Sequence, residues 1–314
     1  MAAYIVRRVL QLPLLLFLVS LIVFALMSMA PGDPVPLMLG EYATPTSVET
    51  VRHELGLDRP LPVRYLSWLA DAVRGDLGWS IQTKQDILFE IRHRLPNTLA
   101  VAVAAMCLAL VMGIPIGIGA AVKHNTWVDH LSMTFALGAL SIPGFVLAIF
   151  LIMVFAVYLR WLPISGSPSV LVDPVGSAPA LILPCVALGA RSAGILARMT
   201  RSCMVEVLNE DYITTARGKG LRNLHIYLRH ALKNAFIPVV TVAGIQFGFM
   251  LGGSIVMEQI FSIPGIGGLM MHAVEARDYP VIQGVSLVVA VMFVAVNLAT
   301  DVLYSYLDPR IRYD

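Results

Sequence analysis

The sequence predicts an all-α protein that crosses a membrane six times, and its composition and its apolar runs support this fold class. Of the 314 residues, 58% are apolar and 13% are charged, whereas a soluble domain has about 25% charged residues. The mean hydropathy is +0.78. The apolar residues form long runs, and a polar segment at residues 191–234 separates the later ones. This segment holds eight of the 22 Lys and Arg residues, so we expect it to receive force from a partner outside the chain.

The first apolar run covers residues 9–30 and follows Arg7 and Arg8. As a helix it is roughly 33 Å long, enough to cross the hydrocarbon core of a bilayer. A cleaved signal peptide is the alternative, since Ser28-Met-Ala30 resembles a cleavage site. The apolar region of a signal peptide is normally only about 7–15 residues long. We therefore expect residues 1–30 to form a cytoplasmic N-terminus and a retained first helix.

Residues 31–96 are predicted to form a large amphipathic loop region on the outer side of the membrane. Pro31-Gly-Asp-Pro34 ends the first helix, because proline cannot continue the hydrogen-bond ladder. Thr46-Ser-Val-Glu49 has the pattern of a capping box that opens a short helix. Residues 63–73, with Tyr65 and Trp68, and residues 86–95 are amphipathic stretches suited to a membrane interface. These elements could dock an external partner or simply cover the outer face, and the sequence leaves both open.

Five further spans are predicted at residues 98–122, 131–158, 179–197, 235–257 and 281–304. With the N-terminus inside, the 123–130 turn, the 191–234 segment and the C-terminal tail all face the cytoplasm. Thirteen of the 22 basic residues then lie on that side, including Arg310 and Arg312 of the tail. The seven basic residues of the 31–96 loop are exempt, because long loops do not follow the positive-inside rule. Only Arg160 and Arg277 remain outside, which is a consistent N-in, C-in topology.

Several residues inside the spans are candidates for a pathway or gate. Pro115 lies in the second span, Ser141, Pro143 and Gly144 lie in the third, and Gln246 lies in the fifth. Proline frees backbone carbonyls that a neighbouring helix or a water-lined path must satisfy, and small residues let helices approach closely. A transport pathway and ordinary close packing explain these residues equally well.

The sequence contains no set of residues for catalysis, so we do not expect an enzyme. Gly218-Lys-Gly220 lacks the spacing and hydroxyl of a phosphate-binding loop, and the seven histidines form no metal or nucleophile motif. The three cysteines form no CxxC pair, so neither a disulfide framework nor a metal site is predicted. Nucleic acid binding is not expected, because membrane spans flank the basic segment. Within the spans, Glu258 and Asp301 are expected to be structural partners rather than parts of an ion relay.

The polar segment resembles a known family. Residues 210–221 read EDYITTARGKGL and residues 229–241 read RHALKNAFIPVVT, a pattern similar to the cytoplasmic EAA loop of bacterial ABC importer permeases. The narrower likeness is to the dipeptide, oligopeptide, glutathione and nickel group, in particular its dipeptide-permease B-like subunits. Further matching blocks lie at residues 31–34, 54–58, 75–78, 199–202, 261–267 and 277–283. Thr214-Thr-Ala216 replaces Glu-Ala-Ala and Lys233 stands where other branches have proline, as is typical of the peptide branch.

The resemblance implies a type I importer permease fold, with residues 97–314 as a five-helix core. It implies a coupling helix at residues 211–218 that docks on an ATPase. Asp211 would suit the helix dipole, and Gly218 and Gly220 would allow the turn into a helix at 221–232. Tyr212, Thr215 and Ala216 are expected to share one face. The expected coupling residues are Glu210, Asp211, Tyr212, Thr215, Ala216, Arg217, Gly218, Lys219 and Gly220.

The resemblance also implies partners, a location and a cargo. A second, similar permease, two ATPase subunits that bind ATP and Mg²⁺, and a periplasmic solute-binding protein are expected around this chain in the bacterial inner membrane. The chain itself is expected to bind no cofactor. The expected cargo is a di- or oligopeptide, with glutathione next and nickel third. The alternative from another class is an ATP-independent secondary transporter or channel, which would need a mid-membrane carboxylate or inverted repeats.

Overall fold

The computed structural model describes residues 2–29, 35–36, 44–54, 56, 58–164 and 173–307. In this described part the regular structure is helical apart from one isolated bridge between Trp79 and Asp86, which confirms the all-α prediction. Five of the described helices are long and apolar enough to cross a membrane. A sixth crossing is present if one sharply bent pair of helices counts as a single span.

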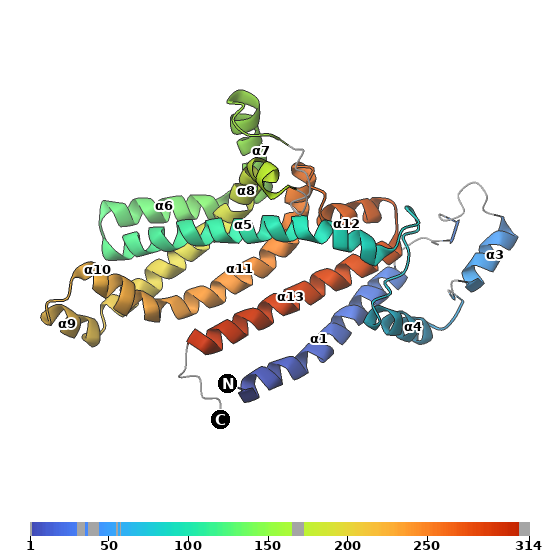
Figure 1. Cartoon of the computed structure of the whole chain (residues 1–314), viewed down its shortest axis with the longest axis horizontal. Coiled ribbons are helices and arrows are strands. Elements are labelled where there is room, and N and C mark those ends of the chain that lie inside the picture. Colours follow the sequence, from blue (N-terminus) through green and yellow to red (C-terminus); the bar gives the residue numbers. More distant parts are fainter. Residues whose placement is uncertain are drawn as a thin grey trace.

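The helices follow one another as α1 (Ala2–Met29), α3 (Pro45–Glu54), α4 (Leu61–Val73), α5 (Ile87–Val122), α6 (Trp127–Ser141), α7 (Gly144–Leu151), the π-helical η2 (Ile152–Tyr158), α8 (Pro174–Leu208), α9 (Asp211–Gly218), α10 (Asn223–His225), the π-helical η3 (Ile226–Ala231), α11 (Leu232–Ile260), α12 (Ile266–Glu275) and α13 (Tyr279–Leu307). α8 packs against α5, α6 and α11, while α13 packs between α11 and α1 (Figure 1).

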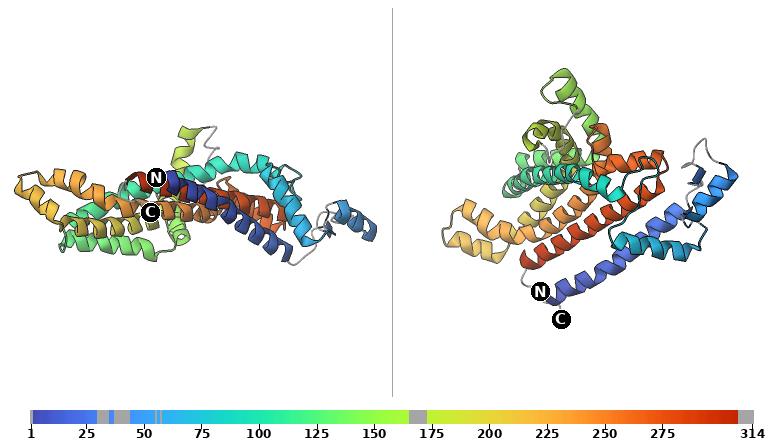
Figure 2. Two further views of the ribbon diagram at one scale, coloured as in Figure 1. Left: turned by 90° about the horizontal axis from the view of Figure 1, so that it is seen from below. Right: turned by 45° about the vertical axis from the view of Figure 1, so that its right-hand side comes forward.

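The two ends of the bundle carry different elements. α9, α10 and the turn between α5 and α6 lie together at one end, and α4 and α12 lie at the other (Figure 1). The turned views in Figure 2 also place α9 and α3 at opposite ends of the molecule. The polar segment therefore gathers at one end, away from the elements of the 31–96 loop region.

α5 and α8 extend well beyond the ends that the sequence predicted. The stretch at 86–95 is the first part of α5, and residues 191–208 of the polar segment continue α8. Asp86 caps α5 by accepting a 2.7 Å hydrogen bond from the backbone N–H of Phe89. The predicted boundaries followed the change from apolar to polar residues. Backbone hydrogen bonding does not stop at that change, because a helix continues when it leaves the apolar layer.

The predicted third span is broken, and its two arms meet at an angle of 99° between α6 and α7. Ile142, at the break, has an extended backbone with φ −87° and ψ 121°. Proline disfavours the helical conformation in the residue before it, so Pro143 accounts for the break. Pro115, in contrast, lies inside the continuous α5.

Among the outer elements, α4 packs on α1. Tyr65 of α4 is buried, its ring centroid lies 5.4 Å from that of Phe24, and its hydroxyl lies 2.8 Å from Ser20 Oγ. Tyr65 therefore anchors α4 on α1 instead of facing the membrane interface. α3 begins at Pro45, so Thr46 lies inside the helix and the predicted capping box is wrong. The predicted turn at 31–34 and the basic tail after residue 307 lie outside the described residues.

Small residues let α5 and α8 approach closely. A Cβ atom on Gly113 of α5 would lie 2.7 Å from the carbonyl oxygen of Ala193 on α8, which is too close for any side chain. Gly113 and Gly117 are buried within this contact. Close helix packing, known from membrane bundles, explains these glycines, and the core beside them contains Ala105, Ala109 and Leu196.

Candidate functional site

The residues 211–218 form the short helix α9, as the resemblance implied. Asp211 lies in its first turn, where a negative charge complements the helix dipole. At the other end Gly220 adopts φ +78°, a left-handed conformation that favours glycine. Its N–H donates a 2.9 Å hydrogen bond to the carbonyl of Arg217. Gly218 is still part of the helix, so the turn into α10 depends on Gly220.

One face of α9 is buried against the bundle. Ile213 is fully buried and Ala216 is 8% exposed. Both belong to an apolar cluster with Cys203 and Met204 of α8 and with Ala121 at the end of α5. The same cluster includes Ile226 and Ala231 of η3, so side-chain packing holds α9 against both α8 and η3.

The other face of α9 is exposed and polar. Asp211, Tyr212, Thr215 and Arg217 are exposed, and the Tyr212 hydroxyl accepts a 2.8 Å hydrogen bond from Asn234 Nδ2. The expectation that Ala216 shares the face of Tyr212 and Thr215 is wrong, because Ala216 is buried. Burial of Ile213 was missed, although an apolar residue three positions before Ala216 is the spacing of a buried helical face. Glu210, Gly218, Lys219 and Gly220 are also exposed.

The pathway candidates lie in three separate places. Ser141 and Pro143 are exposed and Gly144 is half-buried at the bend between α6 and α7. Pro115 is exposed on α5, and the half-buried Gln246 of α11 accepts a 3.3 Å hydrogen bond from Ser192 of α8.

An apolar cavity of about 680 Å³ lies between α1, α11, α12 and α13, and none of the five pathway candidates lines it. The cavity thus gives no support to a pathway through these residues.

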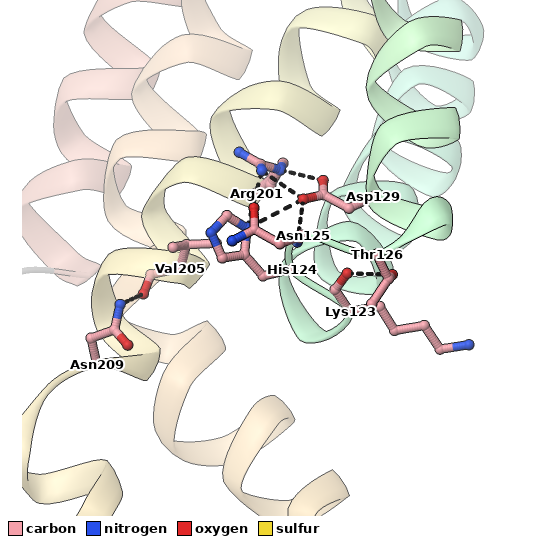
Figure 3. Close-up of polar contacts among 8 residues, drawn as sticks. All are labelled: Lys123, His124, Asn125, Thr126, Asp129, Arg201, Val205 and Asn209. Carbon is pink, nitrogen blue, oxygen red and sulfur yellow. Dashed lines mark hydrogen bonds and ion pairs between the residues drawn. The ribbon is translucent and has the colours of Figure 1, made fainter.

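A buried ion pair joins α6 to α8 near the same end as α9 (Figure 3). Asp129 is 1% exposed, and Nε and Nη2 of Arg201 donate to its two carboxylate oxygens, Nη2 at 2.7 Å. The backbone N–H of Asn125 donates to Asp129 Oδ2 at 3.0 Å, and His124 Nδ1 lies 3.2 Å from the same oxygen. From the sequence, Arg201 was expected to be a cytoplasmic charge and part of the matching block 199–202, and its pairing with Asp129 was not predicted. The signal available in the sequence was Asp129, a single acidic residue at the start of the apolar run that follows the turn after α5.

A second buried carboxylate, Glu258, organises the opposite end of the bundle. It is 1% exposed and accepts hydrogen bonds from Thr98 Oγ1 at 2.6 Å and from the N–H groups of Gly267 and Gly268 at 2.7 and 3.2 Å. Thr98 Oγ1 in turn accepts from the N–H of Ile266. Glu258 therefore connects α11, α5 and the start of α12, which is the structural role predicted for it.

The chain matches a known membrane family over most of its length. Residues 113–313 match the family described as binding-protein-dependent transport system inner membrane component, and residues 1–102 match the N-terminal part of such components. The glutathione transport system permease protein GsiC of Shigella flexneri serotype 5b and that of Escherichia coli strain K12 are each 45% identical to it over 313 residues, which is 100% of both chains.

Two solved structures share the fold. The inward-facing MetNI methionine ABC transporter aligns with a TM-score of 0.60 at 18% identity, over 70% of this chain and 97% of that chain. An amino acid ABC transporter crystallised with histidines aligns with a TM-score of 0.50 at 15% identity, over 71% and 94% of the two chains. At these identities the likeness concerns the fold alone.

Proposed function

Because the chain belongs to the family of inner membrane components of binding-protein-dependent transport systems, we propose that partner ATPases act on it through α9 to import a short peptide of the glutathione kind. The chain is a non-catalytic permease subunit of an ABC importer in the inner membrane. The partners, the site at which they act and the cargo are the parts proposed here.

The observation that carries the coupling role is the two-sided character of α9. Its buried face fixes it to α8 through Ile213 and Ala216, and its exposed face presents Asp211, Tyr212, Thr215 and Arg217 at one end of the bundle. A helix that is fastened to the membrane part and polar outside suits a groove on a soluble ATPase. Ala216 then positions α9 and is not a contact residue, while Glu210, Gly218, Lys219 and Gly220 lie at its exposed ends.

The proposed topology places α9 in the cytoplasm. α9 lies at the same end as the turn between α5 and α6, which carries Lys123 (Figure 1). The beginning of α1 and the end of α13 point toward that side as well. The excess of basic residues there follows the positive-inside rule. α4, α12 and the rest of the 31–96 loop region then face the periplasm, where a solute-binding protein would deliver the cargo.

The transport cycle follows from these positions. A second, similar permease completes the pore, and two ATPase subunits bind ATP and Mg²⁺. ATP-driven closure of the ATPases moves α9 and shifts the bundle from an inward-open to an outward-open arrangement. The bend at Ser141, Pro143 and Gly144 is the proposed gate, with Pro115 and Gln246 as further candidates along the pathway.

Glutathione is the proposed cargo, because the relatives that match the full length are named as glutathione permeases. The sequence alone placed di- and oligopeptides first and glutathione second, and the named relatives reverse this order. Nickel is the third choice.

Reconstitution of the complete transporter tests the proposal. The chain, its chromosomally adjacent permease and ATPases, and the solute-binding protein are purified together and placed in liposomes. We expect labelled glutathione on the binding protein to stimulate ATP hydrolysis and to enter the liposomes. Uptake of dipeptides or Ni²⁺ without uptake of glutathione would correct the cargo. Uptake by the chain alone, without ATP, would reject the importer mechanism in favour of a secondary transporter or channel.

A further inference from the structure

α6 is tied to α8 at two points that lie the same distance apart on both helices. The first is the ion pair between Asp129 and Arg201. The second lies about two helical turns away on each helix, where a Cβ atom on Gly194 of α8 would lie 2.6 Å from the carbonyl oxygen of Ala136 on α6. Two contacts in the same register prevent the two antiparallel helices from sliding or pivoting against each other.

The ion pair is built to persist. Arg201 holds both oxygens of Asp129 in a fork geometry, the strong form of this interaction. Asp129 is 1% exposed, so separation of the pair would leave a carboxylate without its charge partner in a buried position, which is costly. The side chain of His124 lies beside both members, with Nδ1 3.1 Å from Arg201 Nη2. Because His124 belongs to the turn between α5 and α6, this turn is held to the ion pair as well.

The ion pair lies within one helical turn of the residues of α8 that pack against α9. Cys203 and Met204, which pack with Ile213 and Ala216 of α9, follow Arg201 within one turn of α8. Any displacement of α9 that moves this part of α8 also moves Arg201. Asp129 lies at the start of α6, and α6 runs uninterrupted from there to the bend at Pro143.

From this geometry we propose that Asp129 and Arg201 are positioning residues that make α6 follow α8 when α9 moves, so that motion at the coupling helix reaches the bend between α6 and α7. The inference rests on the proposed function, because it assigns the route between the ATPase contact and the gate. Neither residue touches ATP or cargo in this account. Each acts by keeping two helices together.

The test uses the complete reconstituted transporter and the number of cargo molecules taken up per ATP hydrolysed. Asp129→Asn and Arg201→Gln each remove one charge of the pair. Coupling free energies between sites correspond to about 5- to 150-fold, and we expect uptake per ATP to fall about tenfold while complex yield and ATP hydrolysis stay near wild type. The charge-exchanged double variant, Asp129→Arg with Arg201→Asp, should regain much of the ratio.

Asp71→Asn is the matched control. Asp71 forms an ion pair of the same type with Arg74 at 3.6 Å on α4, but both side chains are exposed, 51% and 77%. Exposed pairs contribute little, so this variant should transport as the wild type does. If the unsubstituted transporter shows no ATP-driven uptake, that result rejects the proposed function. It does not bear on whether α6 follows α8. A normal ratio of uptake to hydrolysis in Asp129→Asn and Arg201→Gln would refute the inference.

A distance measurement tests whether α6 follows α8 even if the charge variants fail to assemble. Spin labels at His130→Cys on α6 and Ser202→Cys on α8, both exposed positions, report the separation of the two helices in a background without native cysteines. We expect the same distance with and without trapped nucleotide. A change in this distance during the cycle would show that α6 does not follow α8, and it would overturn the inference.

Discussion

Ile213 supplies most of the apolar contact that holds α9 on the bundle. It is fully buried, and its only buried companion within α9 is the small Ala216. α9 has eight residues, and helices this short are not stable alone in water. Replacing Ile213 by Ala should therefore release α9 from α8, while the long helices of the bundle keep their own packing.

The size of the effect follows from the buried volume that is lost. Ile→Ala in a core costs about 3 kcal/mol and Ile→Val about 1 kcal/mol. Each 1.4 kcal/mol changes an equilibrium tenfold, so the undocked fraction of α9 should rise roughly a hundredfold in Ile213→Ala and about fivefold in Ile213→Val. Since α9 is the proposed contact with the ATPase, uptake per ATP should fall in the same order.

Hydrogen exchange of the amides in residues 209–222 measures this undocking directly, because local opening sets the rate of exchange. The purified transporter is compared as wild type, Ile213→Val and Ile213→Ala. Leu224→Ala is the control, since Leu224 follows α9 closely and is 68% exposed. If exchange in α9 is the same in all four proteins, α9 is not held by the packing of Ile213, and the two-sided description of this helix is wrong.

Three further predictions concern the turn, the helix contact and the buried carboxylate. Gly220→Val should strain the left-handed turn by about 1–2 kcal/mol without a clash at the Cβ position, which lowers uptake per ATP but not assembly. Gly113→Val should separate α5 from α8 and lower the melting temperature of the purified chain. A Cβ atom on Gly119 would meet no atom within 4 Å, so Gly119→Val should not lower it. Glu258→Ala leaves buried donors unpaired at about 1–3 kcal/mol each, and the same melting assay should show a clear loss.

Each of these three predictions has a result that contradicts it. Normal coupling in Gly220→Val would mean that the turn does not position α9. Equal melting temperatures for Gly113→Val and Gly119→Val would contradict the close contact of α5 and α8. A wild-type melting temperature in Glu258→Ala would show that the donors find other acceptors.

The sequence is most informative about features that depend on residues close together in the chain. The bounds of α9 came from the family resemblance, and an acidic first turn and a glycine that can turn left-handed agree with them. The structure has the helix at Asp211–Gly218 with Gly220 at φ +78°. The break after α6 also has a local signal, because Pro143 restricts the residue before it, but the predicted span at 131–158 did not include this break. The ends of α5 and α8 were misplaced because polarity, which the sequence shows directly, does not decide where backbone hydrogen bonding ends.

The contacts that build the candidate site are not local. Asp129 and Arg201 are 72 residues apart in the chain, and each looks ordinary in its own segment. Counting Arg201 as one of the basic residues of a loop hid its role, since its side chain is 25% exposed and paired with a buried acid. The positive-inside rule counts charges and cannot separate those that only set orientation from those that hold helices together.

Two of the connections between α9 and the bundle differ in stiffness. Packing of Ile213 joins it to α8, and α8 is in turn fixed to α6 by Arg201 and Gly194. The chain itself joins α9 to α10 through Gly220, around which no side chain is packed within 4 Å of the Cβ position. A packed contact transmits displacement, whereas an open glycine turn can absorb it. If motion travels through α8, Ile213→Ala and Asp129→Asn should impair coupling to a similar extent, and Gly220→Val should impair it less.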